Sequence, residues 1–413
     1  MLRDVGVHRR ATAIAIAAGV LVTGTSTVRA ADDDVPKRQP SLAWEVPVAC
    51  DSGAVIASAG EAGRHCLLAF SHHSVYVHEH VGPVGQPGPF RLSAHDVATG
   101  AVRWTQEVGE SYEILLTDEA VVLSDKAHIE VFDAATGALR FTRDGGLVQH
   151  NDYGVLVMAA GTSAITAVDA ADGDELWTMP GQVGAMCRDF VAVVPADGEP
   201  AAPFSLVDHR SGRVRWESTM DFDPTTGHMA CSGAPWMYVT DGRWLYELES
   251  FDGWTTWETA APGSVGVDLY REVALVQTGA GGELTTAVRR EDGVVLWEAP
   301  TSTLGADLSW IGRLREDETG LFTLNPLTGA TVQRVDLARP GAAAFEVVGV
   351  SDTRVVVATG STIIAYGMND LGVAWQLEVG ATDDVGVTDG YLVVRAGDRL
   401  RGYAAAPKAG LRR

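Results

Sequence analysis

The chain has 413 residues, 46% of them hydrophobic, and a formal net charge of −23. This composition is ample for a large folded core. A surface this acidic repels nucleic acid and anionic lipid head groups, so both are excluded as expected partners. After residue 30 no segment is long and apolar enough to span a membrane.

Residues 1–30 predict a secretory signal peptide. Basic residues precede an apolar stretch, residues 11–22, that is too short to span a bilayer, and small residues at 28–30 offer a cleavage site. The alternative is an uncleaved signal that anchors the chain. The first cysteine is Cys50, so no lipid attachment is expected near the cleavage site. We expect an exported protein, secreted or held in the periplasm or cell envelope.

Residues 31–40 are predicted to be a linker, residues 41–405 one folded domain, and residues 406–413 a C-terminal tail. A motif recurs through the domain: an acidic residue ends an apolar stretch, a glycine follows, and a tryptophan lies four residues later. Its clearest copy contains Asp96, Gly100 and Trp104. The motif glycines lie 36 to 43 residues apart, at Gly100, Gly137, Gly173, Gly212, Gly253, Gly293, Gly329 and Gly372. A period of about 40 residues indicates a repeat protein. A unit of this length can form four strands, as in one blade of a β-propeller.

Each motif residue has an expected physical role. The acidic side chain accepts hydrogen bonds from backbone N–H groups two residues on, and the glycine takes the positive φ of a tight turn. The tryptophan is expected to be core, packed between neighbouring sheets, with one partner for its N–H. Residues two apart on a strand share a face, so Trp104 is expected to point the same way as Val102, and Trp297 the same way as Val295.

The sequence therefore predicts an all-β protein, a β-propeller of four-stranded antiparallel blades. Nine candidate outer strands are present when Trp44 is counted. Because propellers typically have about four to eight blades, we favour eight and keep nine as the alternative. The last unit lacks a tryptophan strand, so the N-terminal strand that carries Trp44 is expected to complete it. Short apolar runs, such as residues 121–123 and 191–194, are expected to be strands buried on both faces.

The stretch from Ala94 to Trp104 matches the pattern Ala-x-Asp-x-x-Thr-Gly-x-x-x-Trp. This resembles the tryptophan docking motif of the pyrroloquinoline-quinone-like (PQQ-like) propeller repeat, and the likeness covers nearly all of residues 41–405. Within that superfamily the chain looks most like the periplasmic propeller lipoprotein of the outer-membrane protein assembly machinery. The resemblance implies a protein-interaction role, as a scaffold at the cell envelope. The absence of an early cysteine departs from that family.

Six of the eleven histidines lie between His65 and His95. His78 and His80 alternate on one predicted strand, which places both imidazoles on one face at a spacing that suits metal ligands. His72 and His73 lie about 20 Å from them and cannot join the same site. We therefore name His78 and His80 as the candidate metal ligands, joined by Glu79 or by a group from the adjacent long loop. The alternative is a polar, partly exposed strand end.

Four cysteines in an exported chain predict disulfides, for which three pairings exist. Cys50 and Cys66 fall in one repeat unit, and Cys187 and Cys231 fall in neighbouring units, so these two pairs are favoured. Residues 221–227 resemble a calcium loop. Their glycine is at the seventh position and no distal glutamate follows, which favours an ordinary turn.

No nucleophile elbow, phosphate-cradling glycine loop or cysteine–histidine signature is present in the sequence. We therefore predict a non-catalytic, monomeric propeller that binds another protein or a polymer, and the sequence favours no cofactor. One alternative is a sensor that binds a small ligand or a metal through the first unit. The other is a quinone-dependent dehydrogenase, for which the PQQ-like resemblance would imply PQQ, calcium and an aspartate base. The chain lacks the adjacent cysteine pair that many such dehydrogenases use.

Overall fold

The computed structural model describes residues between 39 and 405, with gaps of which the longest are 49–65, 82–88, 301–313 and 338–344. Every regular element in this part of the chain is a β-strand. None of the described residues forms a helix with the length and apolarity that a bilayer crossing requires. The predicted signal peptide, most of the predicted linker and the C-terminal tail lie outside the described residues.

The described strands form nine sheets of antiparallel neighbours, eight with four strands and one with three. The first three sheets are β2–β5 (Cys66–Phe70, Ser74–His80, Phe90–Asp96, Val102–Val108), β6–β9 (Glu113–Leu116, Ala120–Ser124, His128–Asp133, Leu139–Asp144) and β10–β13 (Leu147–His150, Val155–Ala159, Ala164–Asp169, Glu175–Pro180). The next three are β14–β17 (Gln182–Met186, Phe190–Val194, Ala202–Asp208, Val214–Phe222), β18–β21 (His228–Cys231, Trp236–Thr240, Trp244–Glu249, Thr255–Ala260) and β22–β25 (Gly266–Tyr270, Val273–Thr278, Leu284–Arg289, Val295–Pro300). The last three are β26–β28 (Leu314–Asp317, Gly320–Leu324, Thr331–Asp336), β29–β32 (Phe345–Val350, Arg354–Thr359, Thr362–Gly367, Val373–Glu378) and β33–β35 (Asp384–Thr388, Tyr391–Ala396, Arg399–Ala405) with β1 (Pro40–Pro47).

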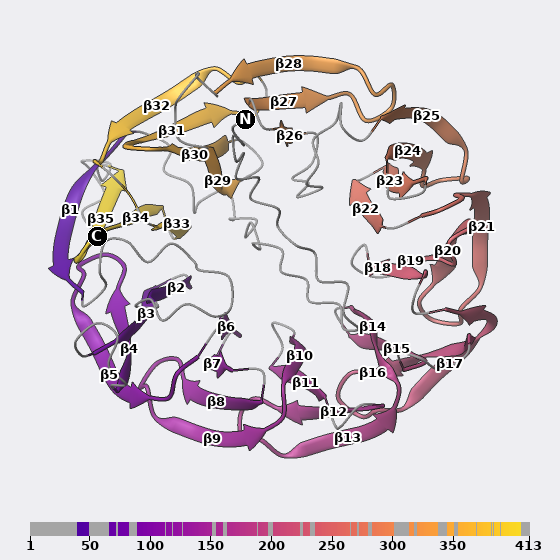
Figure 1. Ribbon diagram of the computed structural model, residues 1–413, viewed down its shortest axis with the longest axis horizontal. Helices are drawn as coiled ribbons and strands as arrows, with labels where there is room; N and C mark the ends of the chain where they lie inside the picture. Colours follow the sequence, from indigo (N-terminus) through magenta and orange to yellow (C-terminus); the bar gives the residue numbers. More distant parts are fainter. Residues whose placement is uncertain are drawn as a thin grey trace, which may run out of the picture.

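The sheets follow one another around a ring (Figure 1). The first strand of each four-stranded sheet lies toward the centre and the last at the rim, except in the ninth sheet, where β33 lies toward the centre and β1 at the rim. The described residues thus hold nine blade-like sheets, the alternative number rather than the favoured eight. β1 pairs with β35, so the two ends of the described chain lie side by side in the ninth sheet. The indole Nε1 of Trp44 on β1 donates to the carbonyl of Val97 in the first unit, at 2.8 Å. This bond ties the ninth sheet to the first.

The core lies between neighbouring sheets. Most second strands are largely apolar, although β3 carries Ser74, His78, Glu79 and His80. The prediction of strands buried on both faces is confirmed for residues 121–123 and 191–194, since every residue of β7 and β15 is buried. One cluster joins Tyr76 and Trp104 of the first sheet to Val121 and Phe132 of the second. Removal of such apolar area from water is the main force that holds stacked sheets together.

The motif forms the expected clamp between consecutive sheets. Asp96 Oδ1 accepts hydrogen bonds from the backbone N–H groups of Ala98 and Thr99, at 3.1 and 2.9 Å. Gly100 has a φ of +72°, and a Cβ there would lie 2.6 Å from the Trp44 ring. Each motif glycine through Gly329 packs in this way against an aromatic ring of the preceding sheet. The indole nitrogens of Trp44, Trp104, Trp177, Trp216, Trp257 and Trp297 each donate to the carbonyl of the residue after the first motif residue of the next unit.

The prediction that Trp104 shares a face with Val102 is wrong. Ala94 pairs with Trp104 but His95 pairs with Val102, so Arg103 is an extra residue, a β-bulge. The bulge rotates the strand, which leaves Val102 58% exposed while Trp104 is 8% exposed. Val295 and Trp297 are separated by the same bulge. Each described rim strand has this bulge, immediately before the residue at the position of Trp104, which we call the docking residue.

Two units have no tryptophan at this position, where Phe141 and Gln333 stand instead, and in the unit of Phe141 the bulge residue supplies a donor. Phe141 packs against Gly173, where an added Cβ would lie 2.6 Å from the ring. The phenyl ring has no N–H, but Nη1 of the neighbouring Arg140 donates to the Ala170 carbonyl at 3.2 Å. Ala170 holds the position whose carbonyl receives the indole N–H in other units. Nη2 of Arg140 also donates to Asp133 Oδ2 at 2.7 Å, which lowers the pKa of that carboxyl to about 2.

Candidate functional site

Two aromatic side chains stand exposed on one motif turn of the fifth sheet. Phe251 is 63% exposed and Trp254 is 70% exposed. Both belong to residues 249–254, between β20 and β21, which we call the aromatic turn. Small, charged or aliphatic residues fill the same two positions in other motif turns: Ala98 and Ala101, Ala135 and Ala138, Ala171 and Asp174, Arg210 and Arg213, Glu291 and Val294, Leu327 and Ala330.

The backbone of the aromatic turn is held by the same clamp as the other turns. Gly253 N donates to the Glu249 carbonyl at 2.8 Å, and Glu249 N donates to the Trp254 carbonyl at 2.9 Å. The Ser250 carbonyl accepts the indole N–H of Trp216 from the fourth sheet at 3.1 Å. The clamp uses backbone atoms and glycine, so it places Phe251 and Trp254 outward without using their side chains.

A buried polar network lies in the fifth sheet beneath this turn. Glu247 is 5% exposed and accepts hydrogen bonds from the Tyr238 hydroxyl and, at 2.7 Å, from Thr256 Oγ1. Arg290, from the motif turn of the sixth sheet, donates through Nε to the Tyr238 hydroxyl oxygen at 2.6 Å. Burial and the bond to Glu247 raise the pKa of Tyr238, so the phenol stays protonated. The network joins the fifth sheet to the sixth.

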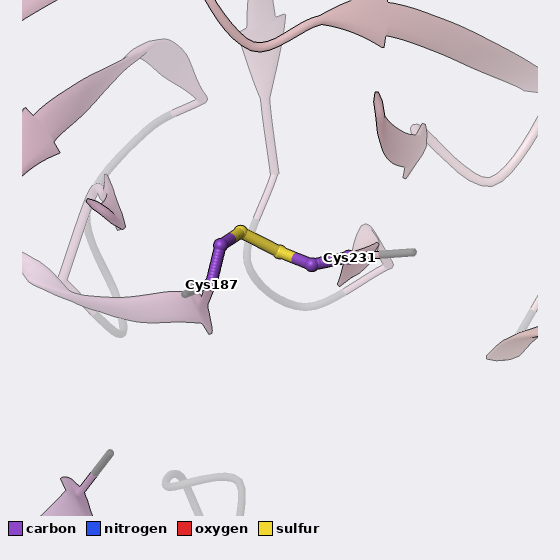
Figure 2. The surroundings of a disulfide bond; sticks show 2 residues. All are labelled: Cys187 and Cys231. Carbon is purple, nitrogen blue, oxygen red and sulfur yellow. A yellow bond between two sulfur atoms is a disulfide. The ribbon is translucent and has the colours of Figure 1, made fainter. Parts of the chain in front are cut away.

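A disulfide joins the fifth sheet to the fourth (Figure 2). Cys187 directly follows β14 and Cys231 ends β18, and their Cα atoms are 5.6 Å apart. This confirms the predicted pairing of Cys187 with Cys231. Cys50, the partner proposed for Cys66, lies outside the described residues. The fifth sheet is thus tied to both neighbouring sheets.

The structure places the two predicted metal ligands on the same side of β3. His78 is fully buried and His80 is 9% exposed, and both rings contact Phe90 of β4. His78 Nε2 lies 3.1 Å from the Gly109 carbonyl oxygen. Within the described residues, no three His, Cys, Asp or Glu side chains gather as a metal site would require. A metal at His78 and His80 stays a prediction.

Glu79 does not join these histidines. It alternates to the opposite face of β3, where Arg91 Nε donates to its Oε1 at 2.7 Å. The residues predicted as a turn at 221–227 contain a backbone bond from Gly227 N to the Asp223 carbonyl at 2.7 Å. Asp221 and Phe222 instead end β17, so the predicted turn begins at Asp223.

Sequence reasoning missed the aromatic turn. The signal was available, because alignment of the repeat units shows two aromatic residues at positions that elsewhere hold small, charged or aliphatic ones. It was overlooked because the period identifies the core tryptophans first, and Trp254 lies only three residues before the docking residue Trp257. Solvent exposure distinguishes the two indoles, because Trp254 is 70% exposed and Trp257 is 8% exposed.

Comparison with known proteins bears on the family. Residues 88–198 and 203–313, together more than half of the chain, match the model of the family described as outer membrane protein assembly factor BamB. No curated protein sequence matches the chain.

Solved structures with a similar fold share little sequence with the chain. BamB from Moraxella catarrhalis is 12% identical, with a TM-score of 0.44, over 71% of this chain and 96% of that one. Quinohemoprotein alcohol dehydrogenase from Comamonas testosteroni is 11% identical, with a TM-score of 0.45, over 94% of this chain and 80% of that one. The match to the family model covers the motif turns of the first six sheets. The chain therefore belongs to the family of the outer membrane protein assembly factor BamB.

Proposed function

We propose that the chain is an exported, non-catalytic scaffold of the cell envelope that binds another protein, and that the aromatic turn is part of its contact surface. The observation that carries the proposal is the exposure of Phe251 and Trp254 on one motif turn. Aromatic residues are enriched at the centres of protein interfaces, where tryptophan is prominent among the residues that dominate binding.

The side chains of Phe251 and Trp254 are not needed to join the fifth sheet to its neighbour. The clamp of the turn is complete through Ser250, Gly253 and Trp216, and alanines serve at the same positions in the first two units. Exposed apolar groups contribute when a partner removes them from water. The hydrogen bonds that hold the backbone of the turn also lower the entropy lost on binding. Membership in the BamB family supports a role in protein assembly at the envelope.

Site-specific photo-crosslinking in the native host tests the proposal. A photoreactive phenylalanine analogue at position 251 should capture one discrete envelope protein. The same analogue at position 98, the equivalent exposed position of the first unit, is the matched control. The double variant F251A/W254A should abolish co-purification of the captured protein while leaving the thermal unfolding curve unchanged. Identical capture from positions 98 and 251, or no capture from 251, would reject this contact surface.

A further inference from the structure

The ring is closed where the ninth sheet packs against the first, at a contact that we call the closing seam. Its buried apolar residues come from both sheets: Trp44, Val393 and Leu400 from the ninth, and Val75, Val77 and Val97 from the first. Strands β33–β35 lie at the opposite end of the described chain from the first sheet. The side-chain packing of this seam, with Trp44 docked on the first motif turn, therefore holds the ring closed.

A histidine is buried at the closing seam. His95 of β4 is 4% exposed and pairs across the sheet with Val75. Its Nδ1 lies 3.2 Å from the Gly100 carbonyl oxygen, and its Nε2 lies 3.0 Å from Ser93 Oγ. Because a carbonyl only accepts hydrogen bonds, Nδ1 carries the proton and Nε2 accepts from the Ser93 hydroxyl. The neutral ring thus supports Gly100, against which Trp44 packs.

The other seams have an apolar residue at this position. The residue immediately before the first motif residue is apolar and buried in the second to seventh units: Phe132, Val168, Val207, Leu248, Val288 and Leu324. Phe132, for example, packs against Trp104 of the preceding sheet. Packing between sheets therefore does not require an ionisable side chain here, and His95 gives the closing seam a property that those six seams lack.

The charged groups that face His95 from the sheets are already paired. Glu79 lies on the same face of β3 as Val75, and Arg91 Nε donates to its Oε1 at 2.7 Å. From the ninth sheet, Arg395 of β34 lies on the same face as Val393 and is 3% exposed. Its Nη2 donates to Asp384 Oδ2 at 3.3 Å. An imidazolium at His95 would thus have no carboxylate of its own.

The remaining ionisable groups near His95 are also engaged or neutral. Asp96 accepts the N–H groups of its own turn, and Arg103 Nη1 donates to Ser74 Oγ at 2.7 Å. Glu45 of β1 alternates away from Trp44 and accepts from Arg401. Tyr391 of β34 is partly buried at the seam, and a phenol is neutral at neutral and mildly acidic pH.

Burial is the largest influence on His95, and it lowers the pKa of the imidazole below its ordinary value of 6.5. The Gly100 carbonyl and Glu79 act in the opposite direction and raise this pKa, whereas Arg91 lowers it. The pKa is therefore lower in the closed seam than in an open, solvated one. The stabilising effect of the neutral ring is complete above pH 6.5 and is lost as pH falls below that value.

We propose that the closing seam is acid-sensitive and that His95 is the group that responds. Protonation at Nε2 places a charge between two packed sheets and ends its acceptance of the Ser93 hydroxyl proton. Opening of the seam returns the charge to water, which is the favoured environment for an imidazolium. Trp44 and β1 then leave the first motif turn, while seams with an apolar residue at this position stay closed. The ring thus opens at one place in mild acid.

Hydrogen–deuterium exchange followed by mass spectrometry tests the proposal on the purified protein at about pH 7.5 and about pH 5, the lower value being above the ordinary range of carboxyl pKa values. Exchange rates divided by the intrinsic rate at each pH give the extent of local opening. The segments that contain β1 and the Gly100 amide, which donates to the Asp96 carbonyl, should open several-fold more at the lower pH. The segment with the Gly253 amide, bonded to Glu249 in the fifth sheet, should not.

Two variants remove the ionisable group. His95→Phe introduces the residue of the second unit, and His95→Gln keeps a neutral side chain that both donates and accepts. Both should abolish the pH response of β1 and Gly100, and the glutamine variant serves if the phenyl ring does not fit. The matched control is His228→Gln, because burial also lowers the pKa of His228 but this residue lies on β18 of the fifth sheet. It should respond as the parent protein does.

The proposal is overturned if the parent protein shows no increase in opening, or if both His95 variants keep the increase. An equal increase at Gly100 and Gly253 would overturn it too, because the whole ring would then loosen in acid. Loss of the response in His228→Gln would assign the sensitivity to a different histidine.

Discussion

Replacement of Gly137 by alanine should cost about 2–5 kcal/mol of stability. Gly137 has a φ of +73°, and an added Cβ would lie 2.5 Å from the Trp104 ring. An L-residue in the left-handed region costs about 1–2 kcal/mol. Overpacking against a ring that is already docked, and hydrogen-bonded to the Ala134 carbonyl at 3.1 Å, costs about 1–3 kcal/mol more.

Gly380 is the matched control, because it has a φ of +81° and no heavy atom within 4 Å of the added Cβ. Gly380→Ala should cost only the conformational part, about 1–2 kcal/mol. Urea unfolding followed by tryptophan fluorescence gives both values, with the slope m compared so that only stability differences are used. If the two alanine variants lose equal stability, the docked indole does not restrict the motif glycine, and the clamp reasoning is wrong.

Two further predictions concern the unit in which Phe141 replaces the tryptophan. Arg140→Ala should cost about 1–3 kcal/mol of unfolding free energy, because the Ala170 carbonyl loses its charged donor. Adding Phe141→Trp to that variant should restore much of the loss. A double variant as unstable as the single one would contradict the idea that Arg140 takes the place of the indole donor. Hydrogen bonds from Arg140 lower the pKa of Asp133 to about 2 from 3.8, so its stabilising contribution is present above about pH 4 and is lost as pH falls toward about 2. Unfolding free energies measured across that window should fall less steeply for Asp133→Asn, and parallel curves would argue against the ion pair.

Much of the ring was predictable from local chemistry. The acidic residue and the glycine of each motif act within one turn, so Asp96 and Gly100 could be assigned roles without knowledge of distant contacts. The completion of the last unit by the strand that carries Trp44 was predictable too, because that unit lacked an outer strand. The histidine strand was less informative. Its i, i+2 spacing gives a shared face, but whether ligands from other elements reach that face depends on how the sheets pack.

The sequence by itself determined the repeat, the turn chemistry and which side chains form the seams, because these depend on residues near one another in the chain. Only the tertiary structure decided the bulge before each docking residue, the exposure of Val102, and the use of Arg140 as a donor to the next unit. A bulge is one residue of a strand that has no partner on the neighbouring strand, and the residue types do not reveal it. It moves the residues before it to the opposite face of the strand. The tertiary structure likewise decided the outward position of Trp254, because Trp216 of the neighbouring sheet docks against Ser250 and Gly253.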